Sequence, residues 1–180
     1  MKKSTLVVAG IVVAAILLVV VMVAGVNNRA ISLEEQISGA EAQISVAEKR
    51  RVDLVYNLVD TVTAYQEYEG ETLLAITEAR ASARAGDADG AMTVLNAVSE
   101  QYPELKANEN YQQLMTELAM TENSIAQYRN NYNEQVKAYN KFVRQFPNSI
   151  ILGIMGYEII ETQYTEYDAP EDAPTDLFGD

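Results

Sequence analysis

The stretch YQQLMTELAMTENSIAQYRNNYNEQVKAYNKF, residues 111–142, decides the fold because its apolar residues recur at helical spacing. The stripe consists of Tyr111, Leu118, Ile125, Tyr132, Tyr139 and Phe146, with Leu114, Tyr128 and Phe142 between them. A heptad pattern of this kind is typical of a helix that buries one stripe against a neighbouring helix. We therefore predict a long helix here, with Asn108 as its amino-terminal cap.

The pair Tyr-Asn occurs twice in this stretch, at 132–133 and at 139–140. Each Asn lies about 100° around the helix from its Tyr, at the edge of the stripe, where a third helix would partly cover it. A covered carboxamide needs hydrogen-bond partners, and only some helix registers supply them. We predict that Asn133 and Asn140, with Asn57 beside Tyr56, are structural residues that fix helix register. Solvated surface Asn is the alternative.

A second long helix is predicted before this one. Its stripe consists of Leu33, Ile37, Ala40, Ile44, Ala47, Leu54, Leu58, Thr61, Tyr65 and Tyr68, and a neighbouring stripe of Val52, Val55, Val59 and Val62 predicts cover from two sides. Arg51 interrupts the first stripe. Because an unpaired buried guanidinium is costly, we predict that Arg51 forms an internal ion pair, with contact to a ligand or partner as the alternative.

Two shorter helical segments are expected between these helices, at 71–85 and 91–102, with Leu74 and Ala81 facing inward and Pro103 ending the second. The sequence GDADG, residues 86–90, separates them. As a calcium loop it would place Ala85 and Asn96 at positions that require acidic ligands, so we interpret it as a polar turn.

Residues 6–26, LVVAGIVVAAILLVVVMVAGV, carry no charge and reach about 30 Å as a helix, enough to cross a bilayer. We predict a retained single-pass anchor in the cell membrane that continues into the first helix. A signal peptide cleaved near Ala24 is the alternative. Lys2 and Lys3 before the span, against Arg29 after it, favour an extracytoplasmic domain.

The segment IILGIMGYEII, residues 150–160, is apolar but too short to span a membrane. If three helices lead away from, back to and away from the membrane, this segment lies at the far tip. We predict that it caps the bundle or binds a partner through Ile150, Ile151, Leu152, Ile154, Met155 and Tyr157.

The composition excludes several kinds of site. The chain has no Cys and no His, so disulfides, thiolate or imidazole zinc sites and Ser-His or Cys-His nucleophiles are excluded. A formal net charge of −13 disfavours binding to nucleic acid. No phosphate loop, metal motif or activated nucleophile is present, so we predict no cofactor and no enzymatic activity.

Several stretches together resemble the LemA family of prokaryotic membrane-anchored helical proteins. They are RRVDLVYNLVDTV (50–62), EAR (78–80), YPELKANENY (102–111), TENSIA (121–126), both Tyr-Asn pairs and FP (146–147). The chain departs from the family at Tyr56, where Pro is usual, near Glu41, where Trp is usual, and at Val26, where a Tyr-Asn pair is usual. The resemblance implies a membrane helix, a long antiparallel bundle and no established enzymatic activity. For some members it implies the opposite orientation.

We therefore predict an all-α protein with an N-terminal transmembrane helix followed by a long antiparallel three- to four-helix bundle. The predicted segments are a short polar N-terminus (1–5), the anchor (6–26), the bundle (27–149), the apolar Gly-containing segment (150–166) and an acidic disordered tail (167–180). The expected function is a non-enzymatic scaffold that assembles as a homo-oligomer or with an envelope protein. A membrane-linked sensory or regulatory module is the alternative, and a hydrolase is third.

Overall fold

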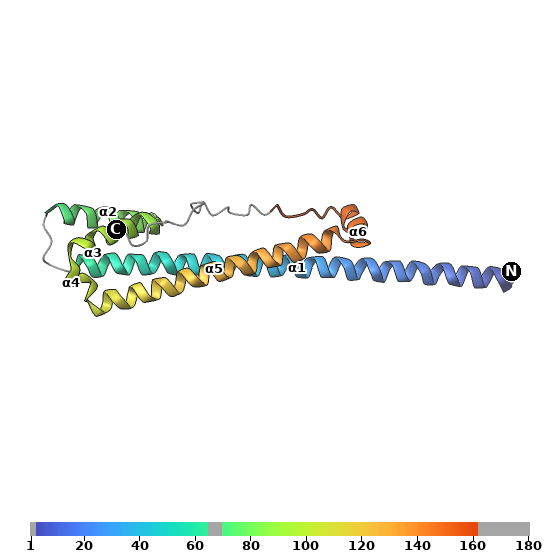
Figure 1. The fold of residues 1–180 in the computed structure, drawn as a ribbon. Coiled ribbons are helices and arrows are strands. Elements are labelled where there is room, and N and C mark those ends of the chain that lie inside the picture. Colours follow the sequence, from blue (N-terminus) through green and yellow to red (C-terminus); the bar gives the residue numbers. More distant parts are fainter. Residues whose placement is uncertain (1–2, 65–69, 162–180) are drawn as a thin grey trace, which may run out of the picture.

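The computed structural model describes residues 3–64 and 70–161, and in these residues the chain forms six helices and no strand. The helices are α1 (Lys3–Thr63), α2 (Gly70–Arg84), α3 (Ala88–Gln101), α4 (Pro103–Lys106), α5 (Glu109–Arg144) and α6 (Asn148–Ile154). The prediction of an all-α fold with a helical bundle is confirmed. α5 runs antiparallel to α1, and α2 and α3 cover the end of α1 that is farthest from the amino terminus (Figure 1).

The predicted anchor and the first helix of the domain form one uninterrupted helix, α1. Within the described residues, α1 contains the one segment long and apolar enough to cross a membrane. Every large apolar side chain from Leu6 to Val21 is at least half exposed, because no other helix packs on this part of α1. The apolar surface is therefore free to contact lipid acyl chains, and the prediction that α1 continues into the domain is confirmed.

The GDADG sequence reverses the chain between α2 and α3. Gly86 has φ +84°, a backbone conformation that side chains with a Cβ rarely adopt. The side chain of Asp87 caps α3 by accepting a hydrogen bond from the backbone N–H of Gly90 at 2.9 Å. A Cβ at Gly90 would collide with the Asp87 carboxylate. The motif is thus a turn and a helix cap, as the polar-turn interpretation predicted.

Helix lengths explain how the chain returns to the anchor. The 36 residues of α5 extend about 54 Å, close to the length of α1 beyond Val26. α2 and α3, with 15 and 14 residues, are each only about 22 Å long, so they cover only the far part of α1. α2 and α3 form a hairpin, so α5 starts at the far end. The prediction that residues 150–160 lie at the far tip is therefore wrong: they lie beside α1 where the anchor ends.

The buried side chains form two separate cores. The far core joins α1, α2, α3, α4 and α5, and its fully buried large residues are Val55, Leu58, Val59, Val62, Leu95 and Leu105. The anchor-side core joins α1, α5, α6 and the residues after α6; it consists of Ala30, Leu33, Ile37, Val136, Tyr139, Val143 and Leu152. Between the cores, α1 and α5 bury Ala40, Ala47, Thr121 and Ile125.

Several detailed expectations need correction. Leu74 and Ala81 are exposed, and α2 instead buries Thr72, Ile76, Ala79 and Ala83. Phe146 is 80% exposed because α5 ends at Arg144, before the stripe reaches it. The cap at Asn108 is confirmed, since its side chain accepts from the Tyr111 N–H at 3.1 Å. Tyr65, Tyr68 and the predicted tail, 167–180, lie outside the described residues.

Candidate functional site

Arg51 joins three helices at the edge of the far core. From α1 its guanidinium forms ion pairs with Asp89 of α3 and Glu122 of α5. Its side chain is only 24% exposed. Partial burial alone would lower the pKa of Arg51, but the hydrogen bond from Arg51 to Asp89 and the charge of Glu122 outweigh burial and raise it. The sequence identified Arg51 as a residue that needs a carboxylate, and the structure supplies two.

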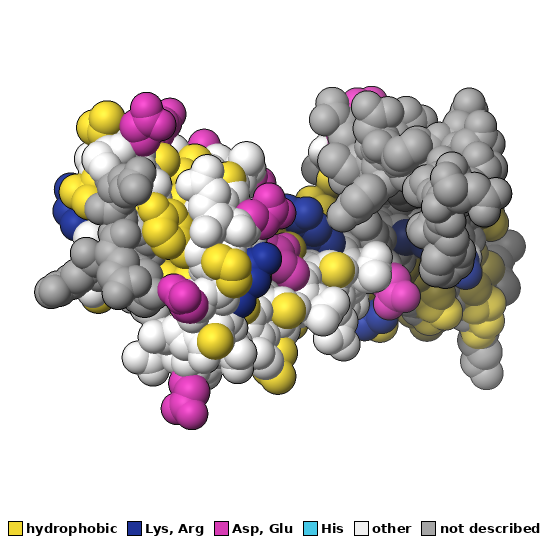
Figure 2. Space-filling model, turned by 60° about the vertical axis from the view of Figure 1, so that its left-hand side comes forward, with side chains coloured by type: hydrophobic (Ala, Val, Ile, Leu, Met, Phe, Trp, Pro, Cys, Tyr) yellow, Lys and Arg dark blue, Asp and Glu magenta, His cyan; other side chains and the backbone are white. Residues whose placement is uncertain are grey.

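A polar cleft of about 400 Å³ surrounds this ion pair. It is lined by Glu48, Arg51, Val52, Gly86, Ala88, Asp89, Glu122, Ile125 and Arg129. Arg129 pairs with Glu48 at 2.8 Å, so the acidic side chains lining the cleft each face a guanidinium. In the space-filling view, basic and acidic side chains lie next to one another in the middle of the molecule (Figure 2). Among the described residues, no three acidic side chains form a group that could hold a metal ion.

A second, more apolar groove lies between α1 and α5, in the part of the bundle that α2 and α3 do not reach. It measures about 330 Å³ and is lined by Ala42, Gln43, Val46, Ala47, Arg50, Thr121, Ser124 and Tyr128. Val46 is 70% exposed at this groove. Ala40, Ala47, Thr121 and Ile125 are buried nearby and belong to neither core. The groove is the position that a third helix would fill in a complete bundle.

The second Tyr-Asn pair holds the chain that follows α6. The Asn140 carboxamide donates to the Ile160 carbonyl at 2.8 Å and accepts from the Ile160 N–H at 2.8 Å. The Tyr139 hydroxyl donates to the Glu158 carbonyl at 3.0 Å. These bonds fix an extended segment against α5, where the sequence predicted cover by a third helix.

Tyr139 is buried and also approaches the Glu34 carboxylate of α1 at 3.4 Å. Burial raises the pKa of the Tyr139 hydroxyl, and the Glu34 carboxylate raises it further. On the same side of the molecule, the Tyr157 hydroxyl donates to Asn27 Oδ1 at 2.9 Å. The residues after α6 are therefore attached to both long helices.

The other predicted structural residues are placed differently. Asn57 and Asn133 are both exposed, so neither is covered by a neighbouring helix in the way that the sequence predicts. Of the predicted partner-binding residues, Leu152 is fully buried in the anchor-side core, whereas Ile150, Ile154 and Met155 are 57%, 83% and 44% exposed. Ile151 and Tyr157 are half-buried. Their roles in register and partner binding stay predictions.

The groove between α1 and α5 was missed by the sequence reasoning. A signal was present: Ala42, Val46 and Ser124 flank the predicted stripes and carry no charge. The two stripes predict packing of three helices, and a third helix of full length would cover these residues. Comparing the lengths of the short helices with that of α5 would have shown that cover was incomplete.

The LemA family model matches residues 40–177 of the chain. The chain belongs to the LemA family. Protein LemA of Metamycoplasma hominis is 32% identical over 134 residues, an alignment that covers 68% of this chain and 61% of that protein. Magnetosome protein MamQ 2 of Paramagnetospirillum magneticum is 33% identical over 76 residues, covering 42% of this chain and 28% of that protein. MamQ of Magnetospirillum gryphiswaldense matches a segment of the same length at 30% identity.

This LemA-family chain thus spans less than two thirds of the curated relatives that it matches. Together, the family assignment, the exposed apolar part of α1 and the helical domain describe a membrane-associated helical protein.

Proposed function

We propose that this LemA-family chain is a non-enzymatic, membrane-anchored scaffold that assembles through the groove between α1 and α5. The observation that carries the proposal is the open two-helix midsection. There Val46 is 70% exposed beside small side chains such as Ala42 and Ser124. Small residues let another helix approach closely, and an apolar groove of this shape fits the apolar face of a helix.

The occupant that we favour is the same groove of a second copy. Two chains anchored in one membrane hold their grooves at the same height, because α1 continues from the anchor into the groove without a break. A two-fold axis along the membrane normal then places identical residues opposite one another, as in most homodimers. Val46 of each copy would lie near the axis.

Disulfide crosslinking of the full chain in membranes tests this proposal. The chain has no cysteine, so Val46→Cys introduces the only thiol. We expect rapid formation of a covalent dimer under mild oxidation. Met120→Cys is the matched control. Met120 lies on α5 beside the groove residue Thr121 and is exposed to a similar extent, 63%, but it does not line the groove. Equal crosslinking of the two variants would contradict assembly through the groove.

A non-enzymatic role is supported by the pairing of charges in the polar cleft. The acidic side chains that line it, Glu48, Asp89 and Glu122, are paired with Arg51 or Arg129. An ion pair engages each carboxylate with a guanidinium of the same chain and not with a bound substrate. The cleft therefore fits a structural role better than general acid catalysis.

The uninterrupted α1 supports a second candidate, a sensory or regulatory module. A rotation of the anchor would reach the far core because both lie on one continuous helix, α1. Inserting one residue after Val26 turns the domain by about 100° relative to the anchor. We expect such an insertion to abolish signalling while far-core unfolding is unchanged, whereas a pure scaffold would keep its crosslinking pattern.

We also infer a single-pass topology with the domain on the extracytoplasmic side, from Lys2 and Lys3 before the anchor against Arg29 after it. Protease treatment of intact cells tests this inference. Digestion of the domain from outside is expected, and full protection would place the domain in the cytoplasm.

A further inference from the structure

The short helix α6 is held at the level where α1 leaves the predicted span. Leu152 is fully buried in the anchor-side core, and the Tyr157 hydroxyl bonds to Asn27, which directly follows the span. Val26, the last residue of the span, packs on the same core. α6 therefore has a fixed height beside the membrane surface.

The exposed face of α6 is apolar. Ile150 and Ile154 are one helical turn apart, on the side opposite Leu152, and are 57% and 83% exposed. α6 carries no charged residue, and its axis lies across the direction of α1 and α5 (Figure 1). Phe146 before α6 and Met155 after it add exposed apolar surface. An exposed apolar patch of this kind marks an interaction surface.

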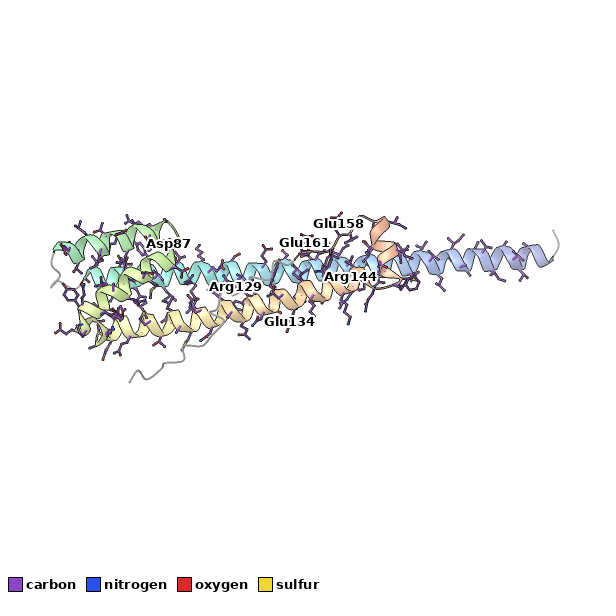
Figure 3. The ribbon with its side chains drawn as sticks, turned by 45° about the horizontal axis from the view of Figure 1, so that its top comes forward. Asp87, Arg129, Glu134, Arg144, Glu158 and Glu161 are labelled. Atoms are coloured by element: carbon purple, nitrogen blue, oxygen red, sulfur yellow. The ribbon has the colours of Figure 1, made fainter. Side chains whose placement is uncertain are left out.

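Charged groups near α6 balance one another. Lys141 and Arg144 lie exposed in the last turn of α5, and Glu158 and Glu161 lie exposed after α6. Figure 3 shows Arg144, Glu158 and Glu161 in the same part of the molecule as α6. With charges of both signs present, no strong attraction to anionic headgroups is expected. Binding at this surface would depend on apolar contact.

We propose that α6 and its flanking residues lie in the interface of the bilayer that holds α1, with Ile150, Ile154 and Phe146 in contact with lipid. An interfacial helix buries its apolar face about 5–10 Å into the boundary between headgroups and acyl chains. Lipid fits this surface better than a second copy because the patch continues the exposed apolar surface of the span, and every anchored chain meets lipid at this height. The inference is independent of assembly through the groove.

The proposal is tested by the depth of single fluorescent labels on the full chain in phosphatidylcholine vesicles. Since the chain has no cysteine, Ile154→Cys can be labelled uniquely with an environment-sensitive dye. Leu17→Cys in the span is the lipid reference, and Leu74→Cys, a 72% exposed apolar site on α2, is the water reference. We expect quenching by lipids with brominated acyl chains to be several-fold stronger at residue 154 than at 74, in low and in high salt.

Ile150→Cys supplies a second reading from the same face of α6. Hydrogen exchange of the Ile160 N–H, which Asn140 protects, reports whether each labelled chain keeps α6 in place. Quenching at 150 and 154 no stronger than at 74, with the Ile160 N–H still protected, would overturn the proposal. Efficient crosslinking of Ile154→Cys between chains would also overturn it, because a second copy would then cover the patch. Loss of quenching in high salt would also overturn the proposal, because it would indicate that electrostatic attraction to headgroups, and not apolar contact, holds α6 at the bilayer.

Discussion

The two cores of the molecule are stabilised in different ways. The far core buries Leu58, Val59 and Leu95 completely among side chains from five helices, and the residues that form it are apolar. The anchor-side core has two long helices and the short α6, and hydrogen bonds from Tyr139, Asn140 and Tyr157 complete it. Apolar burial is non-directional, whereas hydrogen bonds require particular atoms at particular distances. The far core therefore contributes most to stability, whereas the anchor-side core fixes the position of α6 and the residues after it relative to α1 and α5.

The largest effect on this comparison is expected from Leu58→Ala in the far core. Leu58 is fully buried, so the substitution should lower the free energy of unfolding by about 2–5 kcal/mol. Denaturation of the full chain in detergent, followed by circular dichroism, measures this loss. Leu74→Ala at a 72% exposed site should cost much less. Equal losses would mean that the far core is not the stabilising part.

Arg51→Met should have the next largest effect. It leaves Asp89 and Glu122 without their partner and should cost about 1–3 kcal/mol. This is less than for a fully buried pair because the Asp89 and Glu122 side chains are 82% and 46% exposed, so solvent screens their charges. The same denaturation measurement applies. Arg50→Met, at an exposed site 3.8 Å from Glu117, is the control and should change little. Normal stability of Arg51→Met, with loss of crosslinking at the groove, would assign Arg51 to partner contact instead.

Asn140→Leu should act on the anchor-side core alone. It removes both hydrogen bonds to Ile160 and should cost about 1–3 kcal/mol of local stability. Exchange of the Ile160 N–H should become faster, while amides of α2 and α3 keep their protection. Asn133→Leu, at an exposed site, should leave this exchange unchanged. Equal effects of the two substitutions would contradict this prediction, because only Asn140 is hydrogen-bonded to Ile160.

The smallest effect concerns pH. The pKa of Tyr139 is raised by burial and then by Glu34, so the folded chain holds this proton more tightly than the unfolded chain. The stability that Tyr139 contributes is complete below its ordinary pKa of about 10 and is lost as pH rises through the raised value, at most about 1.4 kcal/mol per pH unit. Tyr139→Phe should remove this loss. The difference in unfolding free energy between the two chains, measured below and above this range, should shrink at high pH.

Much of the fold could be predicted from particular residues. The heptads of α5, the double stripe of α1 and the cap at Asn108 follow from spacing and side-chain chemistry, and each is present. Arg51 was recognisable because a charge in an apolar stripe needs a partner. The identity of its partners was not recognisable, because Asp89 and Glu122 come from helices whose packing the sequence does not state.

The main wrong prediction concerns the end of the bundle at which residues 150–160 lie. Treating residues 71–102 as one rod placed residues 150–160 at the far tip, but the turn at Gly86 divides that rod into a hairpin. Consequently Asn140 contacts Ile160 and not a third long helix. The hydrogen bond between Asn140 and Ile160 forms only because the chain reverses direction after the end of α5. The spacing of apolar residues does not predict such a reversal.

The continuous pairing of α1 with the 36-residue α5 also gives the molecule a fixed reach. Helical rise places the far end of the bundle, where α5 begins, about 54 Å from the end of the predicted span, and the α2–α3 hairpin covers about the last 22 Å of that length. Whatever binds the hairpin is therefore held roughly 32–54 Å from the predicted span. Deleting seven residues from each of the two long helices would preserve their facing sides and shorten the spacing by about 10 Å.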